Sequence, residues 1–287
     1  MTGVEEPTLA TRRRATLAAA RARQGRAAMA ECRLCAHDCG VNRAAGRRGL
    51  CGASDETRVF SAQVEVADEM ELIPTFAIAL SGCDMHCTFC VTGLESWDSR
   101  AGTPLDVPDL AARATAALKC GAQTVMILGG EPTIHLPAAL EIAAALPSEA
   151  RLVWKTNAHC SAQARALLDG VFDVWLVDYK FGNDACASRL TQTENYGVVA
   201  RENLLWAAAH SELIVRHLLM PGHVACCWEP IARWLAANLP EVKVSLRCGF
   251  WPAWKDGRYP ELRRTVKTEE EQRAGEIACS YGLHLVE

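Results

Sequence analysis

The sequence has no apolar run long enough to cross a membrane. Its apolar stretches are short and interrupted, and none approaches the ~20 residues that a membrane-spanning helix requires. The N-terminus also lacks the apolar region of a secretory signal. The net charge is −4, so the chain carries no excess of positive charge that would attract nucleic acid. We therefore expect a cytoplasmic protein with neither a membrane nor a nucleic acid as its partner.

Cysteine, by contrast, is abundant, with fourteen residues that fall partly into clusters. In a chain of 287 residues, clustered cysteines indicate reduced thiols and metal centres rather than disulfides. Cys83, Cys87 and Cys90 directly follow the apolar run 76–82, which ends in a glycine where the chain can turn. Iron–sulfur clusters are normally held by four thiolates, so three thiolates leave one iron open for a ligand. A zinc knuckle or buried free thiols are the alternatives.

A second cysteine group lies closer to the N-terminus. Four cysteines fall within twenty residues, with glycines between them that favour a loop-rich knuckle: Cys32, Cys35, Cys39 and Cys51. Four thiolates suffice for a closed tetrahedral site, which could hold zinc or an iron–sulfur centre. His37 lies inside this group, either as a further ligand or as a surface histidine. We expect residues 31–66 to form a small cysteine-rich metal-binding segment.

Positive charge is concentrated at the start of the chain, where residues 1–50 contain ten arginines against four acidic residues. Residues 8–30 are rich in alanine and arginine, which favours a helix. We expect residues 1–30 to contain a basic N-terminal helix. It could pack on the rest of the protein or contact an acidic partner, although a solvated helix face is the simpler interpretation.

From about residue 67 to the C-terminus, short apolar runs alternate with amphipathic segments. This pattern predicts a parallel sheet with right-handed crossovers. The predicted strands are 75–80, 124–128, 151–155, 174–178, 213–219 and 242–246, and the predicted helices lie near 107–119, 137–146, 161–168, 200–209, 230–238 and 269–281. Six such units predict an α/β fold with a partial (β/α)6 TIM-like barrel over residues 67–287, preceded by the helix and the knuckle.

Polar and small residues gather at the predicted strand ends, where barrel active sites form. Paired glycines let a backbone approach a ligand closely, and an adjacent carboxylate can accept a hydrogen bond from an ammonium group. These positions are Gly129, Gly130 and Glu131 after the second strand, Lys155, Thr156 and Asn157 at the third, Asp178 and Lys180 at the fourth, and Arg216 and His217 in the fifth.

The sequence allows two roles for each of two further groups of residues near the strand ends. Four cysteines there are either reactive or metal-binding groups or, more simply, buried small apolar residues: Cys160, Cys226, Cys227 and Cys248. Trp251, Trp254 and Tyr259 form an aromatic-rich loop that either covers a substrate or packs in the core.

The motif Cys-Asp-Met-His-Cys-Thr-Phe-Cys, with Phe89 just before the last cysteine, resembles the signature loop of radical S-adenosylmethionine (SAM) enzymes. The resemblance implies a [4Fe–4S] cluster on Cys83, Cys87 and Cys90, whose open iron binds SAM. It implies reductive cleavage of SAM to methionine and a 5′-deoxyadenosyl radical, which abstracts a hydrogen from a substrate. The family's Gly-Gly-Glu motif, matched at 129–131, binds the amino group of SAM.

Several motifs in order are similar to the narrower group related to the pyruvate formate-lyase activating enzyme. Here Lys180 would bind the SAM carboxylate, Asp178 would organise the site, and Arg216 would neutralise the cluster or that carboxylate. His217 and His223 are weaker candidates. Lys155 stands where activases have an acidic residue that helps to hold a monovalent cation, so we expect no such cation here.

The resemblance leaves the substrate open. An activase-like protein would make a glycyl radical on a partner enzyme and would take electrons from a flavodoxin or ferredoxin. The alternative is modification of a small molecule or peptide in cofactor or natural-product biosynthesis. A third possibility, of another class, is a non-catalytic iron–sulfur or zinc protein for electron transfer or scaffolding, but such a protein needs no SAM site.

Overall fold

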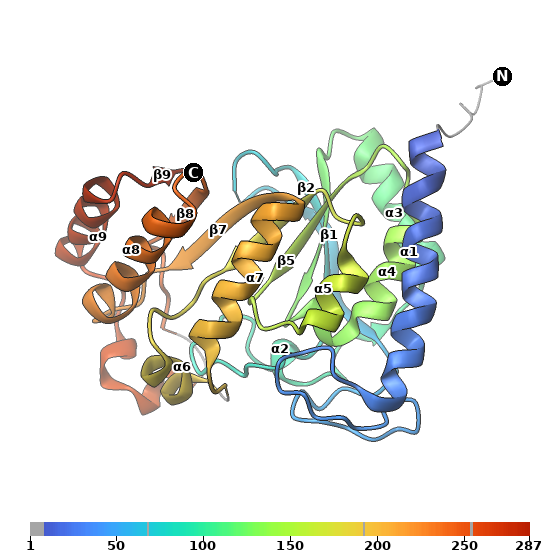
Figure 1. Cartoon of the computed structure of the whole chain (residues 1–287), viewed down its shortest axis with the longest axis horizontal. Helices are drawn as coiled ribbons and strands as arrows, with labels where there is room; N and C mark the ends of the chain where they lie inside the picture. Colours follow the sequence, from blue (N-terminus) through green and yellow to red (C-terminus); the bar gives the residue numbers. More distant parts are fainter. Residues whose placement is uncertain (1–8, 68, 192, 253–254) are drawn as a thin grey trace.

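One continuous sheet organises the chain (Figure 1). The computed structural model describes residues 9–67, 69–191, 193–252 and 255–287. Nine strands follow the order β3-β1-β2-β4-β5-β6-β7-β8-β9. Their bounds are β1 Arg58–Glu65, β2 Thr75–Leu80, β3 Thr103–Pro104, β4 Thr124–Gly129, β5 Arg151–Thr156, β6 Val174–Asp178, β7 Glu212–Leu218, β8 Lys243–Arg247 and β9 His284–Leu285.

The parallel part of the sheet begins at β2 and continues to β9. It contains each of the six predicted strands, and the α/β partial-barrel prediction is confirmed. β1 and β3 are antiparallel additions that the sequence pattern does not predict. The sequence places residues 58–65 in the cysteine-rich segment, whereas the structure pairs them with β2 and thereby extends the sheet.

Helix α1, Leu9–Ala28, precedes the sheet. The other helices lie between the parallel strands: α2 Leu94–Trp97, α3 Val107–Lys119, α4 Leu136–Ala145, α5 Ala162–Leu168, α6 Asp184–Leu190, α7 Tyr196–His210, α8 Glu229–Asn238 and α9 Thr268–Ser280. α3 begins after Asp106, whose carboxylate accepts a hydrogen bond from the amide of Asp109 and so caps the helix. The sequence predicts the helices of the βα units but neither of the short helices α2 and α6. Within the described ranges, no helix is both long enough and apolar enough to span a bilayer.

The basic helix α1 packs on the protein rather than standing free in solvent. It lies beside α4 and α5 (Figure 1). Arg14 donates hydrogen bonds to the carbonyls of Pro147, Ser148 and Ala150, and Arg26 forms a bidentate pair with Glu141. The interpretation of a solvated helix face is therefore wrong, because these arginines bind groups of α4 and of the turn that follows it.

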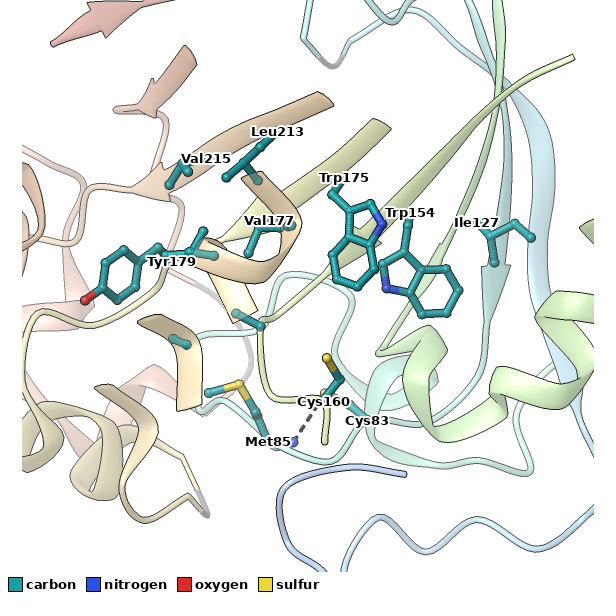
Figure 2. Close-up of a cluster of buried hydrophobic side chains, with 14 of the residues drawn as sticks. Cys83, Met85, Ile127, Trp154, Cys160, Trp175, Val177, Tyr179, Leu213 and Val215 are labelled. Carbon is teal, nitrogen blue, oxygen red and sulfur yellow. Dashed lines mark hydrogen bonds between the residues drawn. The ribbon is translucent and has the colours of Figure 1, made fainter. Parts of the chain in front are cut away.

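Alternate residues of the central strands β4 to β7 enter two separate apolar layers. Toward the helices, a row in register crosses four strands: Ile127, Trp154, Trp175 and Leu213 (Figure 2). Toward the barrel interior, a smaller cluster contains Leu72, Met126, Val153, Val174, Leu176 and Ile214. Since side chains alternate across a sheet, this pattern fixes which polar residues at the strand ends face the interior.

Candidate active site

The turn after β2 carries the cluster loop, residues 83–90. Gly82 makes this turn with φ at +88°, and a Cβ there would lie 2.9 Å from Cβ of Ser99. Cys83 and Cys87 are buried, and Cys83 Sγ accepts a hydrogen bond from the amide of Met85 (Figure 2). Burial raises the pKa of the Cys83 thiol and raises that of Cys87 to about 12, although Lys180 acts in the opposite direction. Deprotonating these thiols therefore requires a strong compensating charge such as iron.

A narrow inner cavity lies beside the three cysteines. It brings together predicted residues from the ends of four parallel strands: Cys83, Cys87, Cys90, Gly129, Gly130, Glu131, Thr156, Asn157, Asp178 and Lys180. Lys155 also lines it. An adjoining outer cavity of about 890 Å³ shares part of this lining and continues toward β1, β7 and the loop after β8. This volume lies within the range of ligand sites.

Paired glycines form one wall of the inner cavity. A Cβ on Gly129 would lie 2.2 Å from the carbonyl oxygen of Leu80, and a Cβ on Gly130 would lie 2.0 Å from that of Gly82. No side chain fits at such distances. The two glycines therefore let β4 and its following turn sit directly against the cluster loop.

Glu131 is a fully buried carboxylate that holds three segments together. Its Oε1 accepts hydrogen bonds from the amide and hydroxyl of Thr133 and the hydroxyl of Thr156, at 3.0, 2.6 and 2.8 Å. Its Oε2 accepts one, from the amide of Asn157 at 2.8 Å. Oε2 has one donor against three on Oε1, so it can accept another hydrogen bond from a ligand. Burial, followed by the charge of Asp84, raises the pKa of Glu131 to about 7.

Lys180 and Asp178 form an ion pair at the end of β6, with Nζ of Lys180 2.6 Å from Oδ2 of Asp178. Nε of Arg216, from β7, lies 3.9 Å from the other carboxylate oxygen. Burial acts to raise the pKa of Asp178, but Lys180 and Arg216 outweigh it and the pKa is lowered. Burial likewise acts to lower the pKa of Lys180, but Asp178 and Cys87 raise it overall. The ammonium group is thus charged and lies between a carboxylate and a cluster cysteine.

Two further predicted residues line the outer cavity, and a third does not reach it. Arg216 and Phe89 contribute to its wall. His217, the next residue on β7, points toward the helices, where its ring stacks on Trp228 and its Nδ1 donates a hydrogen bond to the carbonyl of Tyr179. The structure therefore does not bring His217 to the cavity, because adjacent residues of a strand face opposite sides.

Asp84 and His159 join the site without having been predicted. They are accompanied by His37, which the sequence left as either a further knuckle ligand or a surface histidine. Asp84 accepts hydrogen bonds from His159 Nδ1 at 2.7 Å and from the Asn157 amide group at 2.8 Å. Nε2 of His37, in the knuckle, donates to the carbonyl of Asp84 at 2.8 Å. Asp84 is the only acidic residue of the loop 83–90, and this is the signal that could have indicated it.

The knuckle, residues 32–51, packs against the same region. Cys35 forms an isolated backbone bridge with Cys160, in the segment after β5. Arg43 is buried and donates hydrogen bonds to the carbonyls of Ile134 and Ser54. Burial raises the pKa of both Cys35 and Cys51. The knuckle thus packs on the segment after β5 and contacts the cluster loop through His37.

The remaining candidates divide between the cavity and the core. Cys248 and Trp251 line the outer cavity, and 70% of Trp251 is exposed. Trp254 lies outside the described residues. Tyr259 donates a hydrogen bond to the carbonyl of Arg189, and Cys160 is buried.

The residues of the inner cavity fit an iron–sulfur cluster with SAM. Three thiols converge on it, as a cluster with one open iron requires. A cation, Lys180, and a carboxylate with spare acceptor capacity, Glu131, face the same space as the glycine wall. A zwitterionic amino-acid group needs both charges.

Comparison with known proteins agrees with this geometry. Residues 78–235 match the Radical SAM superfamily. The chain is 32% identical over 265 residues to the uncharacterized protein MJ0674 of Methanocaldococcus jannaschii, covering 89% of this chain and 76% of that protein.

Solved structures share the fold at low sequence identity. Streptococcus suis SuiB bound to the precursor peptide SuiA superposes with a TM-score of 0.53 at 14% identity, over 71% of this chain and 46% of that chain. A spore photoproduct lyase gives a TM-score of 0.53 at 15% identity, over 79% of this chain and 78% of that chain. A radical SAM methyltransferase from Sphaerobacter thermophilus gives a TM-score of 0.53 at 18% identity, over 73% of this chain and 65% of that chain. The chain spans about half the length of SuiB.

Proposed function

This chain belongs to the radical SAM superfamily, and we propose that it cleaves SAM reductively to abstract a hydrogen atom from a peptide or protein substrate. Cys83, Cys87 and Cys90 would hold the [4Fe–4S] cluster. When bound, the cluster and SAM supply the one-electron cleavage and the 5′-deoxyadenosyl radical. The electron would come from a flavodoxin or ferredoxin. All fourteen cysteines are free, which suits the reducing cytoplasm.

The protein's own residues would bind and orient SAM. Lys180 offers a charged ammonium group for the carboxylate of SAM, while Asp178 holds that lysine in place. Oε2 of Glu131 offers its remaining acceptor position to the amino group. Thr156 and Asn157 line the same cavity with polar groups suited to the ribose or the carboxylate. Arg216 lies further out, where it balances Asp178 and faces the space left for a substrate.

The observation that favours a peptide or protein substrate is the apolar rim of the outer cavity. Val91 and Trp251 both line this cavity, and each has 70% of its surface exposed. Large exposed apolar side chains beside a cavity are typical of sites that bind macromolecules. An activase-like reaction on a partner enzyme is one form of this function. A reaction on a precursor peptide, the kind of partner bound in the SuiB–SuiA complex, is another.

Modification of a small molecule is the second candidate. The outer cavity of about 890 Å³ would enclose such a substrate, and Arg216 and Arg247 would bind an anionic group on it. A purely electron-transferring or scaffolding protein is disfavoured, since it would need neither the glycine wall nor the Lys180–Asp178 pair beside the cysteines.

We also propose that the knuckle holds an iron–sulfur cluster rather than zinc. A zinc–sulfur bond of about 2.3 Å places tetrahedral sulfurs about 3.8 Å apart. Among the described residues, the groups of three or more ligand atoms that all lie within 4.8 Å of one another include none of the knuckle cysteines. Sulfurs bound to different irons of a cluster lie farther apart than that. The knuckle contacts the cluster loop through His37, and this contact suits a role in relaying electrons to the cluster.

The proposed reaction is tested on anaerobically reconstituted protein given SAM and dithionite. We expect 5′-deoxyadenosine to form and Cys87→Ala to abolish it; equal product from that variant would disprove the assignment. Iron content tests the knuckle. About eight irons per chain, falling to about four in Cys35→Ser/Cys39→Ser, would support a second cluster, whereas about four in both proteins would refute it.

The substrate class is tested by adding extract of the native host, separated by size into a protein fraction and a small-molecule filtrate. Stimulation of 5′-deoxyadenosine formation by the protein fraction alone supports a peptide or protein substrate. Stimulation by the filtrate alone overturns that part of the proposal and leaves the SAM chemistry intact. Trp251→Ala should weaken the stimulation without changing basal SAM cleavage.

A further inference from the structure

A third cysteine group lies away from both the cluster loop and the knuckle. It combines Cys186 of α6 with His223, Cys226 and Cys227 in the turn that leads from β7 into α8. Their ligand atoms all lie within 4.8 Å of one another. The sequence pattern assigns no role to Cys186, because it is separated from the other three by about forty residues.

The distances within this group are those of a metal site. Sγ of Cys186 lies 3.8 Å from Sγ of Cys226, and Nδ1 of His223 lies 3.4 Å from the sulfurs of both Cys226 and Cys227. Tetrahedral zinc with Zn–S of about 2.3 Å and Zn–N of about 2.1 Å requires sulfur–sulfur separations of about 3.8 Å and sulfur–nitrogen separations of about 3.6 Å. The four groups are therefore already spaced to share one ion.

Local backbone structure produces this convergence. Residues 224–228 form a π-helical turn, an irregularity that often marks functional sites. Gly182 passes so close that a Cβ on it would lie 2.3 Å from the carbonyl oxygen of Cys227. Asn183 caps α6 and donates hydrogen bonds to the carbonyl of Cys226 at 2.6 Å and to Sγ of Cys186 at 3.3 Å. The segment between β6 and α6 and the π-helical turn are thus held together around the four ligands.

His223 is the buried nitrogen donor of this group. His223 is 2% exposed, and Cys227 is fully buried. Binding a metal through Nδ1 leaves the ring proton on Nε2, which needs an acceptor. Nη2 of Arg189 lies 3.3 Å from Nε2, and Glu261 holds that arginine at 2.6 Å. Because a guanidinium only donates hydrogen bonds, Arg189 must move away from Nε2 when His223 binds a metal through Nδ1.

We propose that Cys186, His223, Cys226 and Cys227 bind one structural zinc ion. Four protein ligands leave no open position, which distinguishes a structural site from a catalytic one. Cys186 follows Lys180 by six residues, and the segment between them includes Gly182 and Asn183. The ion would tie this segment to the π-turn and so support the position of Lys180. The site is independent of the proposed reaction, since no ligand belongs to the inner cavity.

Metal analysis of the full-length protein, purified anaerobically without chelators, tests the site. We expect about one zinc per chain, in addition to iron. Cys186→Ser/Cys226→Ser should lose this zinc and keep all iron, whereas Cys35→Ser/Cys39→Ser should leave it unchanged. The matched control, Cys120→Ser/Cys279→Ser, replaces two exposed cysteines outside the site and should change neither metal. Zinc retained in the Cys186→Ser/Cys226→Ser protein, or zinc absent from the wild type, would overturn the proposal.

A second variant separates metal binding from misfolding. His223→Cys supplies a fourth thiolate and should retain zinc, whereas His223→Phe should lose it while folding is checked by circular dichroism. X-ray absorption at the zinc edge should show three sulfurs at about 2.3 Å and one nitrogen at 2.0–2.1 Å in the wild type, and four sulfurs in His223→Cys. A Cys186–Cys226 disulfide found by mass spectrometry in the freshly purified, metal-free protein would instead identify a dithiol pair.

Discussion

Nδ1 of His159 donates a hydrogen bond to the carboxylate of Asp84 across 2.7 Å, and both side chains are buried. Asp84 follows the first cluster cysteine, while His159 lies in the segment after β5. Burial acts to raise the pKa of Asp84, but the hydrogen bond and charge of His159, with a hydrogen bond from Asn157, lower it below its usual value. This pair therefore fastens the cluster loop to the neighbouring strand end with a charged carboxylate.

Replacing Asp84 with alanine should destabilise the protein and loosen the cluster. The substitution leaves His159 and the Asn157 amide buried without their acceptor, which costs about 1–3 kcal/mol for each unpaired group. Denaturant unfolding and iron content measure the effect. Asp84→Asn, which keeps one acceptor, should lose less of both. Unchanged stability and iron in the alanine variant would show that the pair does not hold the loop.

SAM affinity should fall as the pH drops through about 7. Burial raises the pKa of Glu131 to about 7, so the carboxylate is deprotonated above that pH and neutral below it. Only the deprotonated form attracts the amino group of SAM, and its loss weakens binding toward acid pH. Calorimetric titration of SAM between about pH 6 and 8, a range that brackets the pKa of about 7, measures this loss of affinity. In Glu131→Gln the affinity should be lower throughout and nearly independent of pH.

Removing the charge of Lys180 should weaken SAM binding about tenfold or more, the loss expected for a charge-assisted hydrogen bond of about 1.5–3 kcal/mol. Lys180→Met also leaves Asp178 with weaker compensation, so stability should fall. Adding Asp178→Asn should recover stability but not SAM affinity. Recovery of both by the double variant would mean that Lys180 serves only its ion pair.

A methyl group at Gly130 should disrupt the site. The added Cβ would lie 2.0 Å from the carbonyl oxygen of Gly82, so the backbone must move. We expect Gly130→Ala to lose about 1–3 kcal/mol of stability, as for other overpacked sites, together with SAM binding. Gly275→Ala in α9 is the matched control, because nothing lies within 4 Å of its Cβ position. That variant should gain about 0.5–1 kcal/mol from better helix propensity.

Arg216 and His217 should behave differently although they are adjacent. Arg216→Gln removes a charge from the cavity wall and should reduce substrate-stimulated turnover. His217→Gln changes only the helix-facing layer and should lower stability while leaving SAM affinity unchanged. Burial lowers the pKa of His217 to about 4, so this histidine is neutral at neutral pH. A large loss of SAM affinity in His217→Gln would contradict this assignment.

The order of strands, helices and strand-end motifs can be predicted from the sequence because local patterns specify it. Apolar runs, turn glycines and amphipathic segments predict the six βα units, and parallel strands bring their carboxyl ends together. That rule alone gathers Cys83, Gly130 and Lys180 at one edge of the sheet. The same alternation could have separated Arg216 from His217, since adjacent strand residues face opposite sides.

Only the tertiary structure decided the features that depend on contacts between distant segments. Strand β1 is recognisable through its pairing with β2, and Cys186 acquires three possible co-ligands because the short helix α6 packs beside the π-turn. Arg14 and Arg26 become packing residues because α4 and its turn offer acceptors to them. The sequence by itself determined the chemistry available at each strand end, whereas packing at long range determined which of these groups can act together.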